Sequence, residues 1–130
     1  MNNITLIGRL TKAPEARTNK NGNTKVTFTL AVDRNLRKED KGKGYQEADF
    51  IFVEAWGYTG QAVLNFSGKG KRIAVQGQLR IDQNREQQTS FTKILANQVE
   101  IIDFKEKEEQ KPFVNDFEEL DVIDEGRLPF

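Results

Sequence analysis

Apolar residues alternate with polar or small residues in five separate stretches of this chain. A period of two indicates β-strands, because successive side chains of a strand point to opposite faces of a sheet. The alternation is clearest at Val26, Phe28 and Leu30, which are separated by threonines. The pattern predicts strands over residues 2–10, 24–34, 48–57, 72–82 and 89–103.

Between the third and fourth of these strands, the spacing of apolar residues changes to that of a helix. Val63 and Phe66 fall on one helical face, which predicts a short helix over residues 59–67. We expect Thr59 to cap its N-terminus and Gly68 to take the left-handed conformation just after its C-terminus.

Polar segments connect the predicted elements. The stretch Lys12-Ala13-Pro14-Glu15 ends the first strand, since proline lacks an N–H donor. Asn21-Gly22 is a favoured dipeptide for a tight turn between strands. A mobile, basic loop is predicted over residues 34–44, and residues 82–88 form a polar hairpin tip. Loops as long as the first of these are often functional.

The order of elements is three strands, one short helix and two strands. This is the order of an OB-fold, an all-β, five-stranded Greek-key barrel with a helix between its third and fourth strands. Barrel strands need glycines where they bend sharply, and the candidates are Gly8, Gly57 and Gly77. The pattern therefore predicts an OB-fold domain over residues 1–104.

The third strand carries two different rows of side chains. One row is aliphatic and of core size, and consists of Ile51, Val53 and Ala55. The other is aromatic apart from one charge, and consists of Phe50, Phe52, Glu54 and Trp56. A partly wet face rich in aromatic rings suits the stacking of nucleobases. A central strand buried on both sides, with Glu54 near an edge or paired, fits the same residues, and this stretch alone leaves both interpretations open.

After Phe104 the sequence changes character. Residues 105–111 are a charged run without periodicity, and acidic residues then mix with scattered apolar ones as far as Glu125. We predict that residues 105–130 are a disordered acidic tail, because such a composition buries too little apolar surface to fold. The tail ends in Leu128-Pro129-Phe130, an apolar tripeptide with nothing of its own to pack on.

Composition argues against several classes of function. The 130 residues suit one domain plus a tail, and they include no cysteine and no histidine. This removes disulfides, thiolate metal sites and the commonest general base. No carboxylate cluster has the loop pattern of a metal site and no nucleophile stands beside a positioned base, so we expect neither an enzyme nor a cofactor. No signal peptide and no apolar run of about 20 residues is present, so we expect a cytoplasmic protein without membrane contact.

The net charge of zero hides an asymmetry along the chain. Residues 1–103 have a net charge of +5, and residues 104–130 have a net charge of −5. A basic domain followed by an acidic tail is typical of a protein whose domain binds a polyanion.

Taken together, these features resemble the bacterial-type single-stranded DNA-binding proteins (SSB). The resemblance rests on Asn3 to Leu10, Phe28 to Val32, Asp49-Phe50, Gly70 to Arg80 and the terminal Leu128-Pro129-Phe130. It covers nearly all of residues 2–103 plus the tip. The family implies an OB-fold, usually assembled as a homotetramer, that binds single-stranded DNA without sequence preference. It also implies an acidic tip that docks replication, repair and recombination proteins.

The resemblance assigns roles to particular residues. Phe50 and Trp56 stand where the family stacks bases, and Phe52 lies on the same strand face. Leu36 and Asn84 occupy positions at which family members usually have aromatic residues. With these two stacking positions missing, the resemblance implies weaker binding or a greater reliance on charge. The candidate phosphate contacts are Arg34, Arg37, Lys69, Lys71, Arg72 and Arg80.

The predicted docking tip departs from the family pattern. Its candidate residues are Asp124, Glu125, Leu128, Pro129 and Phe130. Family tips run from acidic residues directly into the apolar tripeptide, whereas Gly126-Arg127 intervenes here. A basic receptor pocket repels Arg127, which predicts weaker or more selective docking. The short linker suits a phage- or plasmid-encoded member.

Two other functions fit the same residues. An OB-fold module that binds RNA uses a similar stacking face, and only the family-like tip argues against it. A primosome-type protein-interaction module uses the aromatic row as an assembly surface, and the basic excess of residues 1–103 disfavours it. The predicted function is sequence-independent binding and protection of single-stranded DNA during replication, recombination and repair.

Overall fold

The structure is a computed structural model and describes residues 1–106 of the chain. These residues contain six β-strands, one α-helix and one short 3₁₀ helix. The five predicted strands and the predicted helix are all present, and their ends agree to within two residues. The predicted tail, residues 105–130, lies almost entirely outside the described residues. In chain order the elements are β1 (Ile4–Leu10), β2 (Glu15–Thr18), β3 (Thr24–Asp33), the 3₁₀ helix η1 (Lys38–Asp40), β4 (Ala48–Trp56), α1 (Gly57–Phe66), β5 (Arg72–Asn84) and β6 (Thr89–Ile101).

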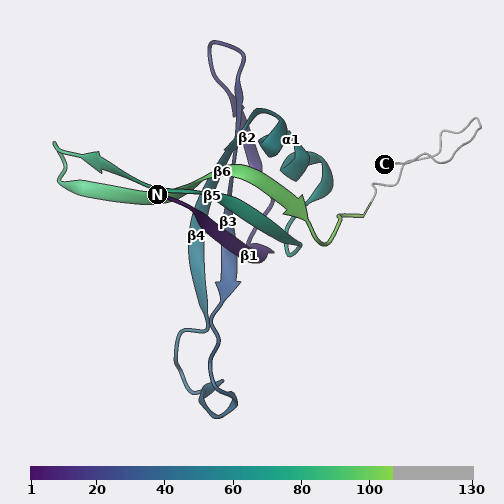
Figure 1. Ribbon diagram of the computed structural model, residues 1–130, viewed down its shortest axis with the longest axis vertical. Helices are drawn as coiled ribbons and strands as arrows, with labels where there is room; N and C mark the ends of the chain where they lie inside the picture. The colour runs from purple at the N-terminus through teal and green to yellow at the C-terminus, as the bar shows by residue number, and fades with distance from the viewer. Residues whose placement is uncertain (107–130) are drawn as a thin grey trace, which may run out of the picture.

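The strands form one sheet in the order β1-β5-β6-β4-β3-β2 (Figure 1). Strand β1 also pairs with β3, through Arg9 with Ala31 and Leu10 with Leu30, and this pairing closes the sheet into a barrel. Neighbouring strands are antiparallel except β4 and β6, which run parallel. A barrel of β1, β3, β4, β5 and β6 with its helix between β4 and β5 confirms the predicted OB-fold.

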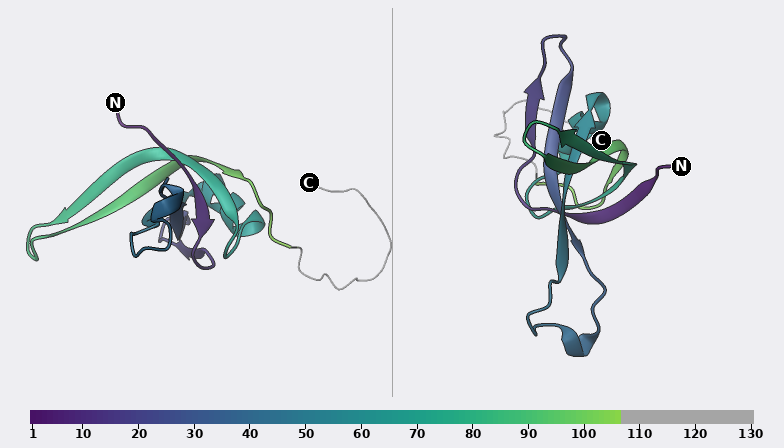
Figure 2. Two further views of the ribbon diagram at one scale, coloured as in Figure 1. Left: turned by 90° about the horizontal axis from the view of Figure 1, so that it is seen from below. Right: turned by 90° about the vertical axis from the view of Figure 1, so that its left-hand side faces the viewer.

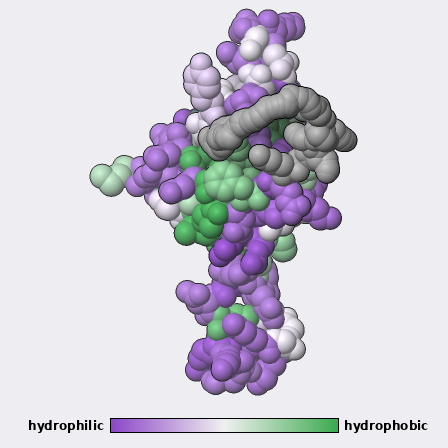
Figure 3. Space-filling model, turned by 90° about the vertical axis from the view of Figure 1, so that its right-hand side faces the viewer, coloured by the Kyte–Doolittle hydropathy of each residue, from purple (hydrophilic) through white to green (hydrophobic). Residues whose placement is uncertain are grey.

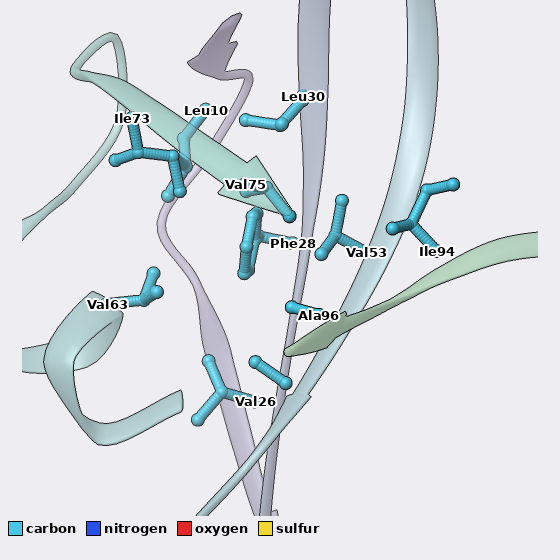
Figure 4. Packing of buried hydrophobic residues seen from close by; sticks show 11 residues of the cluster. Leu10, Val26, Phe28, Leu30, Val53, Val63, Ile73, Val75, Ile94 and Ala96 are labelled. Atoms are coloured by element: carbon cyan, nitrogen blue, oxygen red, sulfur yellow. The ribbon is translucent and has the colours of Figure 1, made fainter. Parts of the chain in front are cut away.

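The hydrophobic core lies inside this barrel, where side chains from all five barrel strands and from α1 point toward one another (Figure 4). Alternate residues of β3 and β4 enter the core, so the period of two in the sequence reflects the inside and the outside of the barrel. Helix α1 contributes Val63, which is fully buried. The core residues are Leu10, Val26, Phe28, Leu30, Val53, Ala55, Val63, Ile73, Val75, Ile94 and Ala96.

Strand β2 was not predicted. It follows Pro14, so the chain breaks where the sequence indicated, but Glu15–Thr18 then pairs with β3 along the outer edge of the sheet. All four residues of β2 are exposed, and none enters the core. A strand without a buried face leaves no apolar alternation to detect. The turn that joins it to β3 contains Asn21-Gly22, as predicted, with Gly22 at φ +85°.

The residues predicted to cap the helix are wrong. The helix begins at Gly57, whose φ of +61° turns the chain out of β4, so Thr59 is not its N-cap. At the other end, Ser67 is extended, and the left-handed glycine is Gly70, with φ +80°, rather than Gly68. Glycine takes this conformation readily because it has no Cβ. The turn into β5 therefore occurs later than the sequence pattern suggested.

Two of the three predicted bend glycines lie where strands approach closely. A Cβ on Gly8 would lie 2.6 Å from the carbonyl oxygen of Ala31 on β3. A Cβ on Gly77 would overlap the carbonyl oxygen of Leu95 and lie 2.9 Å from Cα of Ala96. Gly77 also adjoins an irregularity in the pairing of β5 with β6. These glycines allow the backbones to come together where the barrel closes and bends.

Hairpins and loops extend from the barrel in different directions (Figures 1 and 2). The β2–β3 turn lies at one end, the connection between β3 and β4 at the opposite end, and the outer part of the β5–β6 hairpin to the side. The β3–β4 connection is mostly hydrophilic on the face that Figure 3 shows. Within residues 1–106, α1 and η1 are too short to cross a lipid bilayer.

Candidate nucleic-acid interface

Strand β4 has one buried row and one partly exposed row of side chains. Val53 and Ala55 are fully buried in the core, whereas Phe50 is 67% exposed and Trp56 is 38% exposed. The interpretation of β4 as a strand buried on both sides is therefore wrong, although Glu54 is indeed buried and paired. We call the outward side of β4 and of the adjoining β6 the aromatic face, which consists of Phe50, Phe52, Glu54, Trp56, Phe91 and Lys93.

Small neighbours on β3 leave the rings of Phe50 and Phe52 uncovered on that side. In the antiparallel register, Phe50 lies opposite Ala31 and Phe52 lies opposite Thr29. Neither short side chain rises high enough to cover an aromatic ring. Phe50 and Trp56 are separated by about 20 Å along the strand, at a rise of roughly 3.3 Å per residue. Bases can therefore stack at separate points along this face.

Phe91 is an aromatic residue of this face that the sequence pattern did not single out. Its ring is 50% exposed and lies 5.1 Å from the ring of Phe52, centroid to centroid, in an edge-to-face arrangement. The alternation within β6 indicates that Phe91 points outward, which is the only local signal. Its place beside Phe52 depends on the parallel pairing of β4 with β6, in which Val53 is in register with Ile94.

Glu54 lies in the middle of the aromatic face and is only 7% exposed. Its Oε2 accepts a hydrogen bond from Nε1 of Trp56 at 2.8 Å, and its Oε1 accepts one from Nζ of Lys93 at 3.0 Å. Burial raises the pKa of Glu54, but the hydrogen bonds from Lys93 and Trp56 outweigh it, so the pKa lies below the ordinary value of 4.5. Glu54 is therefore ionised at neutral pH and compensated by a cation.

Two lysines adjoin this carboxylate and the indole ring. Lys93 also contacts Oδ2 of Asp82 at 3.0 Å, and hydrogen bonding to Glu54 and to Asp82 raises the pKa of Lys93. A lysine shared between two carboxylates carries little free charge for a phosphate. Nζ of Lys25 lies 5.9 Å from the ring centroid of Trp56, at the outer limit of a cation–π contact.

Arg80 is a predicted phosphate contact that is in register with a residue of the aromatic face. It is paired with Lys93, so its side chain leaves the sheet on the same side, and its Nη2 donates to Oε1 of Gln78 at 3.0 Å. Arg37 lies in the β3–β4 connection instead, 3.5 Å from a carboxylate oxygen of Asp40. Contact between either arginine and a phosphate stays a prediction.

The other arginines predicted to contact phosphates form two-contact ion pairs with aspartates. Nη2 of Arg34 lies 2.7 Å from Asp49, and Nε of Arg72 lies 2.8 Å from Asp103. The hydrogen bond from each arginine lowers the pKa of its aspartate. A phosphate must compete with these carboxylates for either guanidinium.

Lys69 and Lys71 lie in the turn between α1 and β5, away from β4. The backbone of this turn contacts the end of β1, where the N–H of Leu10 donates to the carbonyl of Lys71 at 3.1 Å. Among residues 1–106, neither Lys69 nor Lys71 takes part in an ion pair. The structure therefore brings Arg80 near the predicted stacking residues and leaves these two lysines apart from them.

The two positions that lack a family aromatic have other surroundings. Oδ1 of Asn84 accepts hydrogen bonds from the backbone N–H groups of Glu86 and Gln87 at 3.1 and 3.3 Å, and so shapes the β5–β6 turn. Leu36 is partly buried in the β3–β4 connection. Phe52 and Phe91 provide two adjacent rings on the aromatic face. These rings lie on β4 and β6, not at positions 36 and 84.

The predicted docking tip lies outside the described residues, from Asp124 and Glu125 to Leu128-Pro129-Phe130. It therefore stays a prediction. Within residues 1–106, no cluster of three acidic residues is placed to hold a metal ion, and the sequence has no histidine or cysteine.

A solved protein has the same fold as this chain. The crystal structure of a deletion mutant of the single-stranded DNA binding protein from Thermus aquaticus matches with a TM-score of 0.61 at 24% identity. The match covers 85% of this chain and 45% of the Thermus chain. At this identity the likeness concerns the fold alone.

Relatives with similar sequences extend the comparison to the whole chain. "Single-stranded DNA-binding protein 3" of Clostridium acetobutylicum is 32% identical over 148 residues, and the match covers 100% of both chains. "Single-stranded DNA-binding protein A" of Bacillus subtilis is 38% identical over 106 residues, which are 82% of this chain and 60% of the relative. The model of the single-strand binding protein family matches residues 1–102. The chain therefore belongs to the single-strand binding protein family.

Proposed function

We propose that this chain binds single-stranded DNA without sequence preference. Bases stack on Phe50, Phe52 and Trp56, and basic side chains, Arg80 foremost, contact the phosphates. The names of its relatives, single-stranded DNA-binding proteins, support single-stranded DNA as the ligand. Binding is an equilibrium process in which no covalent bond is formed or broken.

The observation that carries this proposal is the exposure of several aromatic rings along one face of a barrel. Phe50 of β4 is 67% exposed and Phe91 of β6 is 50% exposed. Val53 and Ala55, on the opposite side of β4, are fully buried in the core. Exposed apolar side chains gathered on one surface mark interaction sites. Every nucleobase has a π face, so stacking on such rings tolerates any base sequence.

The charge distribution supports a polyanionic ligand. Residues 1–103 have a net charge of +5. Each neutralised phosphate releases counterions, so the logarithm of affinity should fall with the logarithm of salt concentration by about 0.7 per contact for a single strand. The fixed ion pairs of Arg34 and Arg72 lead us to expect that fewer than six of the predicted cations contribute.

We also propose that the protein acts in replication, recombination and repair as a homotetramer in the cytoplasm. These points rest on the family and not on a contact within residues 1–106. The tip, Asp124 to Phe130, would recruit partner proteins through its acidic residues and its terminal phenylalanine. Arg127 would make this docking weaker or more selective than a purely acidic tip.

The single tryptophan of the chain provides the experiment that tests DNA binding. Oligo-dT is titrated into the protein at two salt concentrations while the fluorescence of Trp56 is followed, and oligo-rU and an abasic deoxyribose-phosphate strand are measured in parallel. Strong, salt-sensitive quenching by oligo-dT supports the proposal. The abasic strand keeps the phosphates but lacks bases, so it should bind more weakly and quench less.

Other outcomes of the titration point to other functions. Quenching that is stronger with oligo-rU than with oligo-dT would contradict the DNA proposal and favour an RNA-binding module. Unchanged fluorescence without binding of any strand would favour a protein-interaction surface.

Deletion of residues 116–130 tests the role assigned to the tip. We expect the shortened chain to bind oligo-dT as well as the full chain or more tightly, because an acidic segment that competes with DNA is gone. Its capture of replication and repair proteins should be lost. A loss of DNA affinity upon this deletion would contradict the division between domain and tail.

A further inference from the structure

Glu54 is a buried carboxylate at the centre of a surface that we propose binds a polyanion. It lies on β4 between Phe52 and Trp56 and is 7% exposed. A negative charge at this place repels phosphates, and its burial removes favourable hydration. Stacking on the neighbouring rings does not itself require a carboxylate, so the presence of Glu54 calls for another role.

Both carboxylate oxygens of Glu54 are engaged. Oε2 accepts a hydrogen bond from the indole Nε1 of Trp56 at 2.8 Å, and Oε1 accepts one from Nζ of Lys93 at 3.0 Å. The indole N–H is the only hydrogen-bond donor of a tryptophan side chain. A bond to this group at the edge of the ring restricts the ring's rotation and leaves its faces unblocked by the carboxylate.

The position of Glu54 is supported from two other strands. Lys93 of β6 contacts both Glu54 and Asp82 of β5, each at 3.0 Å. The side chain of Lys93 is 19% exposed, so its ammonium group is held within the sheet surface rather than free in solvent. Lys93 thus offsets the charge of Glu54, and Asp82 holds Lys93.

We infer that Glu54 is a positioning residue for base stacking, which orients the ring of Trp56 through its N–H while Lys93 and Asp82 hold the carboxylate in place. This inference rests on the proposed function. A ring that is ordered before binding loses less conformational entropy when a base stacks on it. Glu54 therefore strengthens DNA binding without contacting DNA.

A double-mutant cycle tests whether Glu54 acts through Trp56. The four proteins are the wild type, Glu54→Val, Trp56→Phe and the double variant, and each is titrated against fluorescein-labelled oligo-dT by anisotropy. Valine suits a strand, and phenylalanine keeps an aromatic ring but has no N–H for Glu54 to hold. Any new phosphate contact by the released Lys93 affects both backgrounds alike and cancels in the cycle.

In the wild-type background, we expect Glu54→Val to weaken oligo-dT binding on the order of fivefold, the effect of ordering one side chain. In the Trp56→Phe background the same change should not weaken binding, because the indole N–H that Glu54 holds is absent. Equal effects in the two backgrounds would overturn the inference and leave the proposed function intact. If the wild type does not bind oligo-dT at all, the proposed function fails and the inference fails with it.

A matched control and a second readout guard against a merely structural effect. Glu100→Val removes an exposed carboxylate of β6 that is in register with Ala74, away from the aromatic face, and should not weaken binding. In the free protein, time-resolved anisotropy should show that Trp56 is more mobile on the nanosecond timescale in Glu54→Val than in the wild type. In Glu100→Val this mobility should equal that of the wild type. Unchanged mobility in Glu54→Val would overturn the inference.

Glu54→Gln serves in the same cycle if Glu54→Val does not fold. Glutamine keeps a neutral acceptor for the indole N–H, and neutral hydrogen bonds are roughly half as strong as charged ones. We therefore expect a smaller coupling with Trp56→Phe, on the order of twofold. Absence of any coupling would again overturn the inference.

Discussion

Replacing Phe50 by alanine separates the two roles that a surface aromatic residue can have, in stability and in binding. Phe50 stands opposite Ala31 in the β3–β4 register and is 67% exposed, so about a third of its surface is covered by the protein. Its ring is the most exposed of the aromatic face. If bases stack on this face, the loss of the ring should affect DNA affinity more than folding.

The structure allows both costs to be worked out. A fully buried phenylalanine covers roughly 200 Å², so a third of this area, at about 25 cal/mol per Å², corresponds to at most about 1.7 kcal/mol of folding free energy. Alanine still covers part of the same surface, so the measured loss should be smaller. A stacked base contributes about 1–3 kcal/mol, which corresponds to a loss of DNA affinity between about fivefold and 150-fold.

The assay compares Phe50→Ala with Phe104→Ala. Phe104 is 61% exposed and makes an edge contact with Phe66 at 5.9 Å, so it matches Phe50 in size and exposure but does not lie on the aromatic face. Urea denaturation measures stability, and anisotropy of labelled oligo-dT measures affinity. We expect only Phe50→Ala to lose affinity. Equal affinity of the two variants, with quenching of Trp56 retained, would refute stacking on Phe50.

Three further predictions follow from particular contacts. Gly77→Ala should lower the free energy of unfolding by about 3 kcal/mol, because the new methyl group overlaps a carbonyl oxygen of β6, whereas Gly68→Ala has 3.8 Å of room. Equal urea midpoints of the two variants would contradict the close approach of β5 and β6. Burial raises the pKa of Glu54, but hydrogen bonds from Lys93 and the indole lower it to below 4.5, so its contribution to stability is present above pH 4.5 and is lost as the pH falls through the depressed value. Glu54→Gln should therefore flatten the acid side of the stability profile, and an unchanged profile would show that the pair does not stabilise the fold. Finally, Arg80→Gln should reduce the slope of the logarithm of oligo-dT affinity against the logarithm of salt concentration by about 0.7 in magnitude. An unchanged slope would show that Arg80 is a solvated charge that does not contact a phosphate.

Most of the barrel could be predicted because its signal is local. Each barrel strand must send alternate side chains into one core, so the apolar period of two appears in the sequence of β3 without reference to any other strand. Strand β2 could not be predicted in this way. It is held by backbone pairing to β3, and all its side chains remain in solvent. The predicted N-cap of the helix was wrong because a local pattern does not show that Gly57 turns the chain at the rim of the barrel.

The candidate site was only partly predictable. The aromatic row of β4 was visible as a row, but the same residues fitted a surface or a second core face. The exposure of Phe50 and Trp56 in the structure shows that the row is a surface. This exposure depends on which other parts of the chain cover the two rings, and the sequence of β4 does not show that. The predicted basic residues were visible as charges, yet the ion pair of Arg34 with Asp49 joins residues that a linear pattern does not connect.

By itself, the sequence determined the number of barrel strands and the place of the helix, because each of these follows from periodicity within one segment. Only the tertiary structure decided the surroundings of Trp56. Glu54 meets Lys93 because β4 and β6 run side by side in parallel, and Phe91 reaches Phe52 through the same pairing. Such contacts depend on closure of the whole barrel, which sets the register between strands that are far apart in the chain and leaves no pattern in either strand alone.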